Sequence, residues 1–207
     1  MKRTELLNID LDTNPIVTFS SYFGSGKSTL LTILAAECYS DGKKILFLTE
    51  TKAMHILKRF NKCLGTNQFN GNLTVLSVGL NETDLEPYFK KNYDLIVVDY
   101  QIKSNQFEKI SELSKHYGVA IITSVQLNRF KPQDNLFETN KIPLYSSDIF
   151  SVVTRKELTE KTFFVRLLNK LMFWKKEPNV YIKVVKNIYG KEFTTDLHID
   201  FENVKIK

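Results

Sequence analysis

One short loop, Gly-Ser-Gly-Lys-Ser at residues 24–28, constrains the fold of this chain more than any other part of its sequence. The loop follows an apolar run at residues 16–20 and precedes an apolar-faced helical pattern at residues 28–39. Backbone N–H groups of such a loop curl around a phosphate, and the helix N-terminus adds the positive end of its dipole. The sequence therefore predicts a phosphate-binding loop between a buried strand and a helix, and the alternative is an ordinary surface loop.

The side chains of this loop suit a nucleoside triphosphate with Mg²⁺. Lys27 is expected to neutralise the β and γ phosphate oxygens, and the Ser28 hydroxyl is expected to ligate Mg²⁺. The predicted nucleotide-binding residues are Gly24, Ser25, Gly26, Lys27, Ser28 and Thr29. The loop departs from the usual pattern at its first position, where Ser21 stands in place of a glycine.

The rest of the chain alternates short apolar runs with helical patterns. Strands are predicted at residues 16–20, 44–49, 73–78, 94–99, 119–124, 149–154, 180–187 and 192–199, and helices at residues 28–39, 52–64, 82–91 and 105–117. Runs that are apolar at consecutive positions are typical of parallel strands covered by helices on both faces. We therefore expect a single α/β domain over residues 1–207: a mostly parallel twisted sheet flanked by helices, with a C-terminal β-hairpin.

Two acids end predicted strands, at the sheet edge where open α/β sheets bind ligands. Asp99 follows the run Leu-Ile-Val-Val, and we predict that it completes the Mg²⁺ site with Ser28. Glu50 directly follows the run at residues 44–49, and we predict that it positions the water that attacks the γ-phosphate. The competing interpretations are a turn cap for Asp99 and a first-turn helix acid for Glu50.

Composition limits the class of protein without identifying a partner. Lys and Arg number 29 against 23 Asp and Glu, so the net charge of +6 admits a polyanion such as nucleic acid. Cys38 and Cys63 stand apart, which argues against a disulfide framework or a zinc site. No apolar run reaches the length of a membrane span or a signal-peptide core, so we expect a cytoplasmic protein.

Four segments together resemble a known family. They read ILFLTE at residues 45–50, DLIVVDY at 94–100, SVQLNR at 124–129 and KNIYG at 186–190. Their order is similar to that in the RecA-like ATPase domain of DnaB-type (superfamily 4) replicative helicases, in a minimal form that lacks the N-terminal domain. The resemblance implies a RecA-like P-loop fold that binds and hydrolyses ATP with Mg²⁺ and acts on single-stranded DNA as a homo-oligomeric ring or filament.

The resemblance also assigns roles to residues. It implies that Gln126 contacts the γ-phosphate and that the following loop, with Arg129, Lys131 and Lys141, faces DNA. It further implies that Lys186 reaches the γ-phosphate of an adjacent subunit. The arginine-finger position, however, holds Ile188.

That departure predicts slow intrinsic turnover unless Arg155 or an accessory protein replaces the finger. It keeps two other functions open. One is a recombination mediator or annealing ATPase with the same core. The other is a nucleotide-binding regulatory or partner-recruiting protein whose ATPase activity has decayed.

A basic, apolar segment at residues 160–176 has its own amphipathic pattern. Phe164, Leu167, Leu171 and Trp174 fall on one helical stripe. The stripe is compatible with a helix docked on the sheet, with a subunit or partner interface, and with a helix lying on a membrane surface. The sequence does not separate these three.

Overall fold

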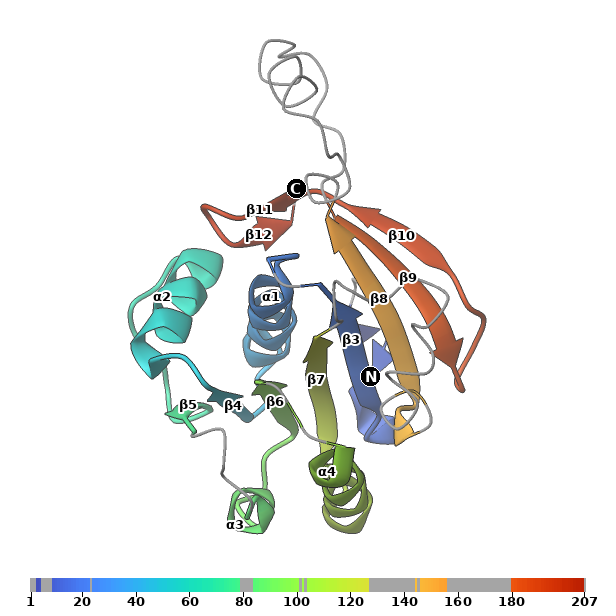
Figure 1. Cartoon of the computed structure of the whole chain (residues 1–207). Helices are drawn as coiled ribbons and strands as arrows, with labels where there is room; N and C mark the ends of the chain where they lie inside the picture. Colours follow the sequence, from blue (N-terminus) through green and yellow to red (C-terminus); the bar gives the residue numbers. More distant parts are fainter. Residues whose placement is uncertain are drawn as a thin grey trace, which may run out of the picture.

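The fold is built around one eight-stranded sheet. The computed structural model describes residues 3–4, 9–22, 24–78, 84–100, 102, 104–126, 144, 146–155 and 180–206. The strands of this sheet are β3 (Ile16–Ser21), β4 (Ile45–Thr49), β5 (Leu73–Ser77), β6 (Leu95–Asp99), β7 (Ala120–Gln126), β8 (Ile149–Arg155), β9 (Val180–Asn187) and β10 (Thr194–Leu197). Their order across the sheet is β10-β9-β8-β3-β7-β6-β4-β5 (Figure 1). The strands β3 to β8 run parallel, and β9 and β10 are antiparallel to their neighbours, as the sequence predicted.

Helices cover both faces of the sheet. Helices α1 (Lys27–Ser40) and α2 (Ala53–Leu64) pack on one face, and α3 (Glu86–Phe89) and α4 (Ser104–Tyr117) pack on the other (Figure 1). The strand β4 shows why the apolar runs are continuous, because Phe47 packs with the α1 and α2 layer while Leu46 and Leu48 pack with the other. Successive side chains of a strand point to opposite faces, so a strand buried on both sides must be apolar throughout.

Two sequence predictions are wrong in extent. Of the helix expected at residues 82–91, the described residues 84–91 form only α3, whose first turn contains Pro87, and Asn92 beyond it has a left-handed φ of 51°. The second strand of the hairpin, expected to reach residue 199, ends at Leu197. The chain then leaves the sheet and pairs β11 (Ile199–Asp200) with β12 (Lys205–Ile206). Figure 1 shows this small hairpin beside α1 and α2.

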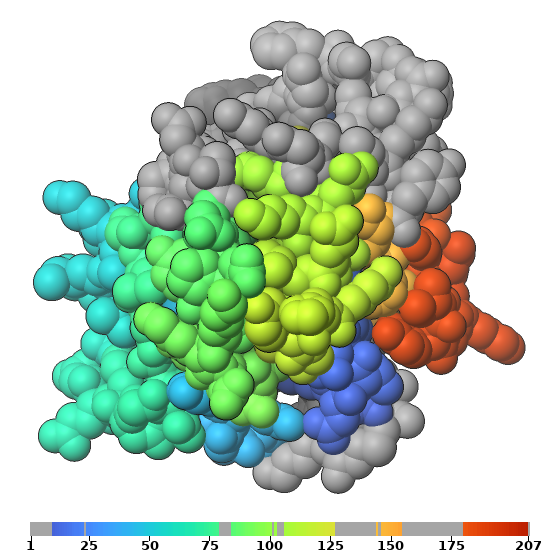
Figure 2. Space-filling model, turned by 90° about the horizontal axis from the view of Figure 1, so that it is seen from below, coloured from blue at the N-terminus to red at the C-terminus, as the bar shows by residue number. Residues whose placement is uncertain are grey.

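Three short elements lie outside the main sheet near the N-terminus. The strands β1 (Arg3–Thr4) and β2 (Ile9–Asp10) pair antiparallel, and a 3-10 turn at Leu11–Thr13 leads into β3. Figure 2 shows the face seen from below, where α3 and α4 cover the sheet. Within the described residues, no helix combines the length and the apolar character needed to cross a membrane.

The parallel register fixes where the site lies. Ser21 pairs with Gln126 across β3 and β7, and Thr49 pairs with Asp99 across β4 and β6. The carboxyl ends of these four strands therefore lie at one edge of the sheet. At this edge the chain passes from β3 into α1 and from β4 toward α2.

Candidate nucleotide-binding site

The loop between β3 and α1 has the backbone of a phosphate-binding loop. Gly24 and Gly26 have left-handed φ values of 80° and 88°, which a residue with a side chain rarely adopts. The Ser25 side chain is buried, and both its N–H and its hydroxyl donate to the carbonyl oxygen of Tyr22, at 3.3 Å and 2.6 Å. Lys27 then begins α1, so the helix N-terminus opens directly onto the loop.

Ser21 does not disturb this loop. It is the last residue of β3, it is fully buried, and it is not among the described residues with positive φ. A glycine is needed where the backbone must adopt φ above zero or where a Cβ would clash. Neither condition holds at Ser21, so its substitution for the usual glycine adds no backbone strain.

The Lys27 side chain folds over the loop. Its ammonium donates to the carbonyl oxygens of Ser21 and Tyr22, at 3.3 Å and 3.5 Å. Burial lowers the pKa of Lys27, and the negative charge of Asp99 opposes that shift. An ammonium held by two long hydrogen bonds in a desolvated position interacts favourably with any anion that enters the loop.

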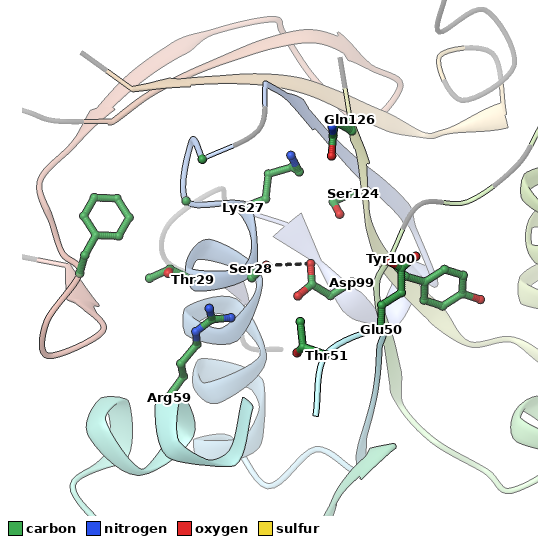
Figure 3. A pocket seen from close by; sticks show the side chains of 13 residues that line it. Lys27, Ser28, Thr29, Glu50, Thr51, Arg59, Asp99, Tyr100, Ser124 and Gln126 are labelled. Carbon is green, nitrogen blue, oxygen red and sulfur yellow. Dashed lines mark hydrogen bonds between the residues drawn. The ribbon is translucent and has the colours of Figure 1, made fainter. Parts of the chain in front are cut away.

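The Ser28 hydroxyl donates to Oδ1 of Asp99 across 3.1 Å, as the dashed line in Figure 3 shows. Burial raises the pKa of Asp99, while the Ser28 hydrogen bond and the charges of Arg59 and Lys27 oppose the rise. A hydroxyl and a carboxylate at this separation are hard oxygen donors of the kind that Mg²⁺ takes together with phosphate oxygens. The described residues hold no cluster of three or more His, Cys, Asp or Glu, so a metal here would depend on the nucleotide for its other ligands.

Glu50 and Gln126 complete the same edge. Glu50 directly follows β4 and is exposed, and Gln126 is the exposed last residue of β7. Both line the pocket that contains Lys27 and Asp99. An exposed carboxylate beside a phosphate-binding loop is placed to hold a water molecule, and an amide at the next strand end is placed to bond a phosphate oxygen.

The pocket has a volume of about 540 Å³. Its lining residues are Gly24, Gly26, Lys27, Ser28, Thr29, Glu50, Thr51, Arg59, Asp99, Tyr100, Ser124, Gln126 and Phe201 (Figure 3). The structure thus brings the predicted loop, metal and catalytic residues together, except that Ser25 supports the loop from beneath and Lys186 lies elsewhere. The roles assigned to these residues stay predictions.

Phe201 was missed by the sequence analysis. It follows β11, and its ring packs so closely on the loop that a Cβ at Gly26 would lie 2.5 Å from its Cε1 atom. The turn that carries it is held by Oδ1 of Asp200, which accepts from the N–H groups of Glu202 and Asn203, and by Lys62 of α2, which donates to the Glu202 carbonyl oxygen across 2.8 Å. This ring is placed at the pocket by contacts between the C-terminal segment and residues distant in sequence, among them Lys62 of α2.

Arg59 was also missed. It lies on the flank of α2 that faces α1, and its guanidinium points toward the first turn of α1 (Figure 3). The only sequence signal is that Arg59 adjoins the buried positions Ile56 and Phe60 in the helical pattern of α2. That pattern by itself does not distinguish a pocket residue from a partly buried surface arginine.

Lys186 does not line the pocket. Its register partner in β8 is Phe150, near the amino end of the parallel strands, and its ammonium donates to the carbonyl oxygens of Leu144 and Ser147. Its predicted contact with the nucleotide of an adjacent subunit stays a prediction. The predicted DNA-facing residues Arg129, Lys131 and Lys141, and the amphipathic segment at 160–176, lie outside the described residues.

Comparison with known proteins supports the fold. No family model and no curated protein sequence matches the chain. Among solved structures, the chain is similar to one described as an "ATPase Domain", with a TM-score of 0.69 and 14% identity over 94% of this chain and 84% of that one. It is also similar to "The Structure Of A DnaB-Like Replicative Helicase And Its Interactions With Primase", with a TM-score of 0.68 and 14% identity over 95% of this chain and 59% of that one. The chain therefore has the fold of the ATPase domains of DnaB-like helicases, and it spans less than two thirds of the second protein.

The raised pKa of Asp99 predicts that its ionised form destabilises the protein without nucleotide and Mg²⁺. Because the folded-state pKa lies above the unfolded value, Asp99 contributes stability at low pH, and this is lost as pH rises through the folded-state pKa. Asp99→Asn should therefore raise the Tm at pH 8, by about 2–4 °C for each kcal/mol gained. Thermal melts from pH 4 to pH 8 test this.

The gain in Tm should shrink as pH falls, because the protonated carboxyl of Asp99 and the amide of the asparagine variant have similar shape and charge. Glu112→Gln offers a control for the removal of one carboxylate, because Glu112 is exposed on α4. A Tm difference that is absent at pH 8, or that stays constant down to pH 4, would contradict the prediction.

Proposed function

We propose that this protein binds ATP with Mg²⁺ and hydrolyses it. The observation that carries the proposal is the contact of Ser28 with Asp99, beside Lys27 and within one pocket with Glu50. An ATPase needs a phosphate-binding loop, two hard oxygen ligands and a water-positioning carboxylate in one place. The structural likeness to helicase ATPase domains supports the fold on which this proposal rests.

In the proposed reaction each side chain has one task. Lys27 exchanges its long bonds to loop carbonyl oxygens for bonds to phosphate oxygens. Ser28 and Asp99 would hold Mg²⁺, which would neutralise charge on the phosphates. Glu50 orients the attacking water, and Gln126 bonds the γ-phosphate. At the other end of the pocket, the Phe201 ring offers an aromatic surface on which the nucleobase stacks.

The proposal is tested by measuring ATP hydrolysis in the presence and absence of single-stranded DNA across a range of protein concentrations. Glu50→Gln should lower kcat by about 100-fold or more while leaving ATP affinity within about threefold, because it keeps shape and removes the charge that orients water. Lys27→Ala serves as the binding-deficient control. Hydrolysis by Glu50→Gln at the parental rate would transfer the catalytic role to another acid.

We further propose that the ATPase acts on single-stranded DNA as a homo-oligomer, in the manner of a DnaB-like helicase or a related replication motor. One similar structure is described as a DnaB-like replicative helicase with its interactions with primase, and the net charge of +6 favours a polyanionic partner. Stimulation of hydrolysis by DNA together with a steep dependence on protein concentration would support this. Nucleotide binding without either would favour a regulator.

Arg129 and Lys131 should then contact DNA phosphates. Replacing both with alanine should weaken binding to every sequence and reduce the slope of log K against log salt by about two units, since each contact releases roughly one counterion. Fluorescence anisotropy of labelled oligonucleotides between about 50 and 200 mM salt provides the measurement. An unchanged slope would mean that Arg129 and Lys131 do not contact DNA phosphates.

A specific observation favours the regulator as the second candidate. Ile188 occupies the position where the resemblance expects an arginine finger, and it is 59% exposed at the turn after β9. An apolar side chain at this position supplies no charge to a neighbour's γ-phosphate. Because the site is exposed, an arginine there fits without burying a charge.

Ile188→Arg should therefore raise kcat on the order of tenfold or more at protein concentrations where subunits associate, and should leave it unchanged in dilute protein. Ile188→Gln adds a polar side chain at the same exposed position without the charge and serves as the matched control. A flat kcat for Ile188→Arg at every concentration would mean that this turn does not reach a neighbour's nucleotide.

A further inference from the structure

The pocket contains a second cation whose hydrogen bonding is incomplete. The Nη1 atom of Arg59 is buried and makes no hydrogen bond in the described part of the chain. Guanidinium N–H groups are strong donors, and leaving one buried and unpaired is costly. A donor of this kind at the wall of a pocket is available to an acceptor on a bound ligand.

The position of Arg59 narrows the choice of acceptor. Figure 3 shows its guanidinium directed at the first turn of α1, near Ser28 and Thr29, and the ammonium of Lys27 directed toward Gln126. Lys27 and Arg59 are the basic residues among the described residues that line the pocket. The two cations therefore lie on different sides of Ser28, so they address different parts of a phosphate chain.

The charge of Arg59 acts on Asp99, the acid proposed to bind Mg²⁺. Burial raises the pKa of Asp99, and Arg59 is one of the groups that oppose the rise, together with the Ser28 hydroxyl. The guanidinium is thus within electrostatic range of the place where phosphate and Mg²⁺ are expected to meet. A cation that acts on Asp99 also attracts phosphate oxygens that enter the same desolvated pocket.

We propose that Arg59 is a nucleotide-binding residue whose guanidinium donates to the α and β phosphate oxygens, the part of the phosphate chain that ADP and ATP share. This inference rests on the proposed function of the pocket. Two features point to the shared phosphates. Arg59 lies on the Thr29 side of Ser28, and Glu50 and Gln126, the expected γ-phosphate residues, lie on the other side (Figure 3). Phe201, the proposed base platform, packs against Gly26 of the same loop.

A guanidinium suits this task better than an ammonium would. Its planar fork donates two parallel hydrogen bonds to phosphate oxygens, and it stays charged when desolvated. It also comes from the same chain as the loop. The contribution of Arg59 to nucleotide affinity therefore does not depend on oligomerisation. An arginine finger, in contrast, is supplied by a neighbouring subunit.

The test measures equilibrium binding of ADP and of a non-hydrolysable ATP analogue, each with Mg²⁺, by isothermal titration calorimetry. Arg59→Met keeps the apolar stem and removes the charge, and it should weaken both ligands by the same factor, about 10- to 100-fold. Lys58→Met is the matched control, because Lys58 is the adjacent residue of α2 and is exposed. It should bind both ligands as the parent does.

Arg59→Lys keeps the charge and loses the planar fork of the guanidinium, so its affinity for both ligands should fall several-fold. This variant remains informative if Arg59→Met unfolds. Parental affinity in both Arg59 variants would overturn the inference while leaving the proposed function in place. A loss confined to the triphosphate would overturn the assignment to the shared phosphates. If the parent itself binds neither ligand, the proposed function fails, and the inference fails with it.

Discussion

The parallel pairing of β3 with β7, and of β4 with β6, is the constraint on which the site depends. It sets the carboxyl ends of four strands at one edge, so Ser21, Thr49, Asp99 and Gln126 end their strands side by side. The helix α1 then begins where phosphate would bind, and its buried residues fix it against the same strands. A one-residue shift of register would turn Asp99 away from Ser28, because successive side chains face opposite sides of a strand.

This arrangement places Lys27 and Asp99 in positions where burial disfavours their charged forms. Burial lowers the pKa of Lys27 and raises the pKa of Asp99, so both shifts favour the neutral form. Within the chain, Lys27 makes long bonds to carbonyl oxygens of the loop, and Asp99 accepts a hydrogen bond from Ser28. A polyphosphate with a divalent cation supplies the opposite charge to each of them. Burial of these charges thus lowers the stability of the fold and strengthens the attraction for a charged ligand, as is common at functional sites.

The two departures from the helicase pattern differ in their physical consequences. Ser21 sits in extended strand backbone, where a side chain is tolerated, so it leaves the phosphate loop intact. Ile188 is exposed at the β9 turn and brings no charge. Lys186, close to it in sequence, bonds carbonyl oxygens of Leu144 and Ser147 in its own chain. The loop geometry is therefore intact within this chain, while the position at which the resemblance expects an arginine finger carries no charge.

The strand runs, the loop at residues 24–28 and the acids that end the strands follow from the sequence alone, because these features depend on local periodicity and on backbone conformation. The sequence also placed Glu50 and Asp99 at one edge, since parallel strands share the direction of their ends, whereas Gln126 was singled out only by the family resemblance. That Arg59 and Phe201 line the pocket follows from the folded structure and not from any local pattern. Their positions depend on how α2 packs against α1 and on how the segment after β11 is held by Lys62, and these are contacts between parts of the chain far apart in sequence. Local pattern carries no information on such contacts, because they are set by the packing of whole elements.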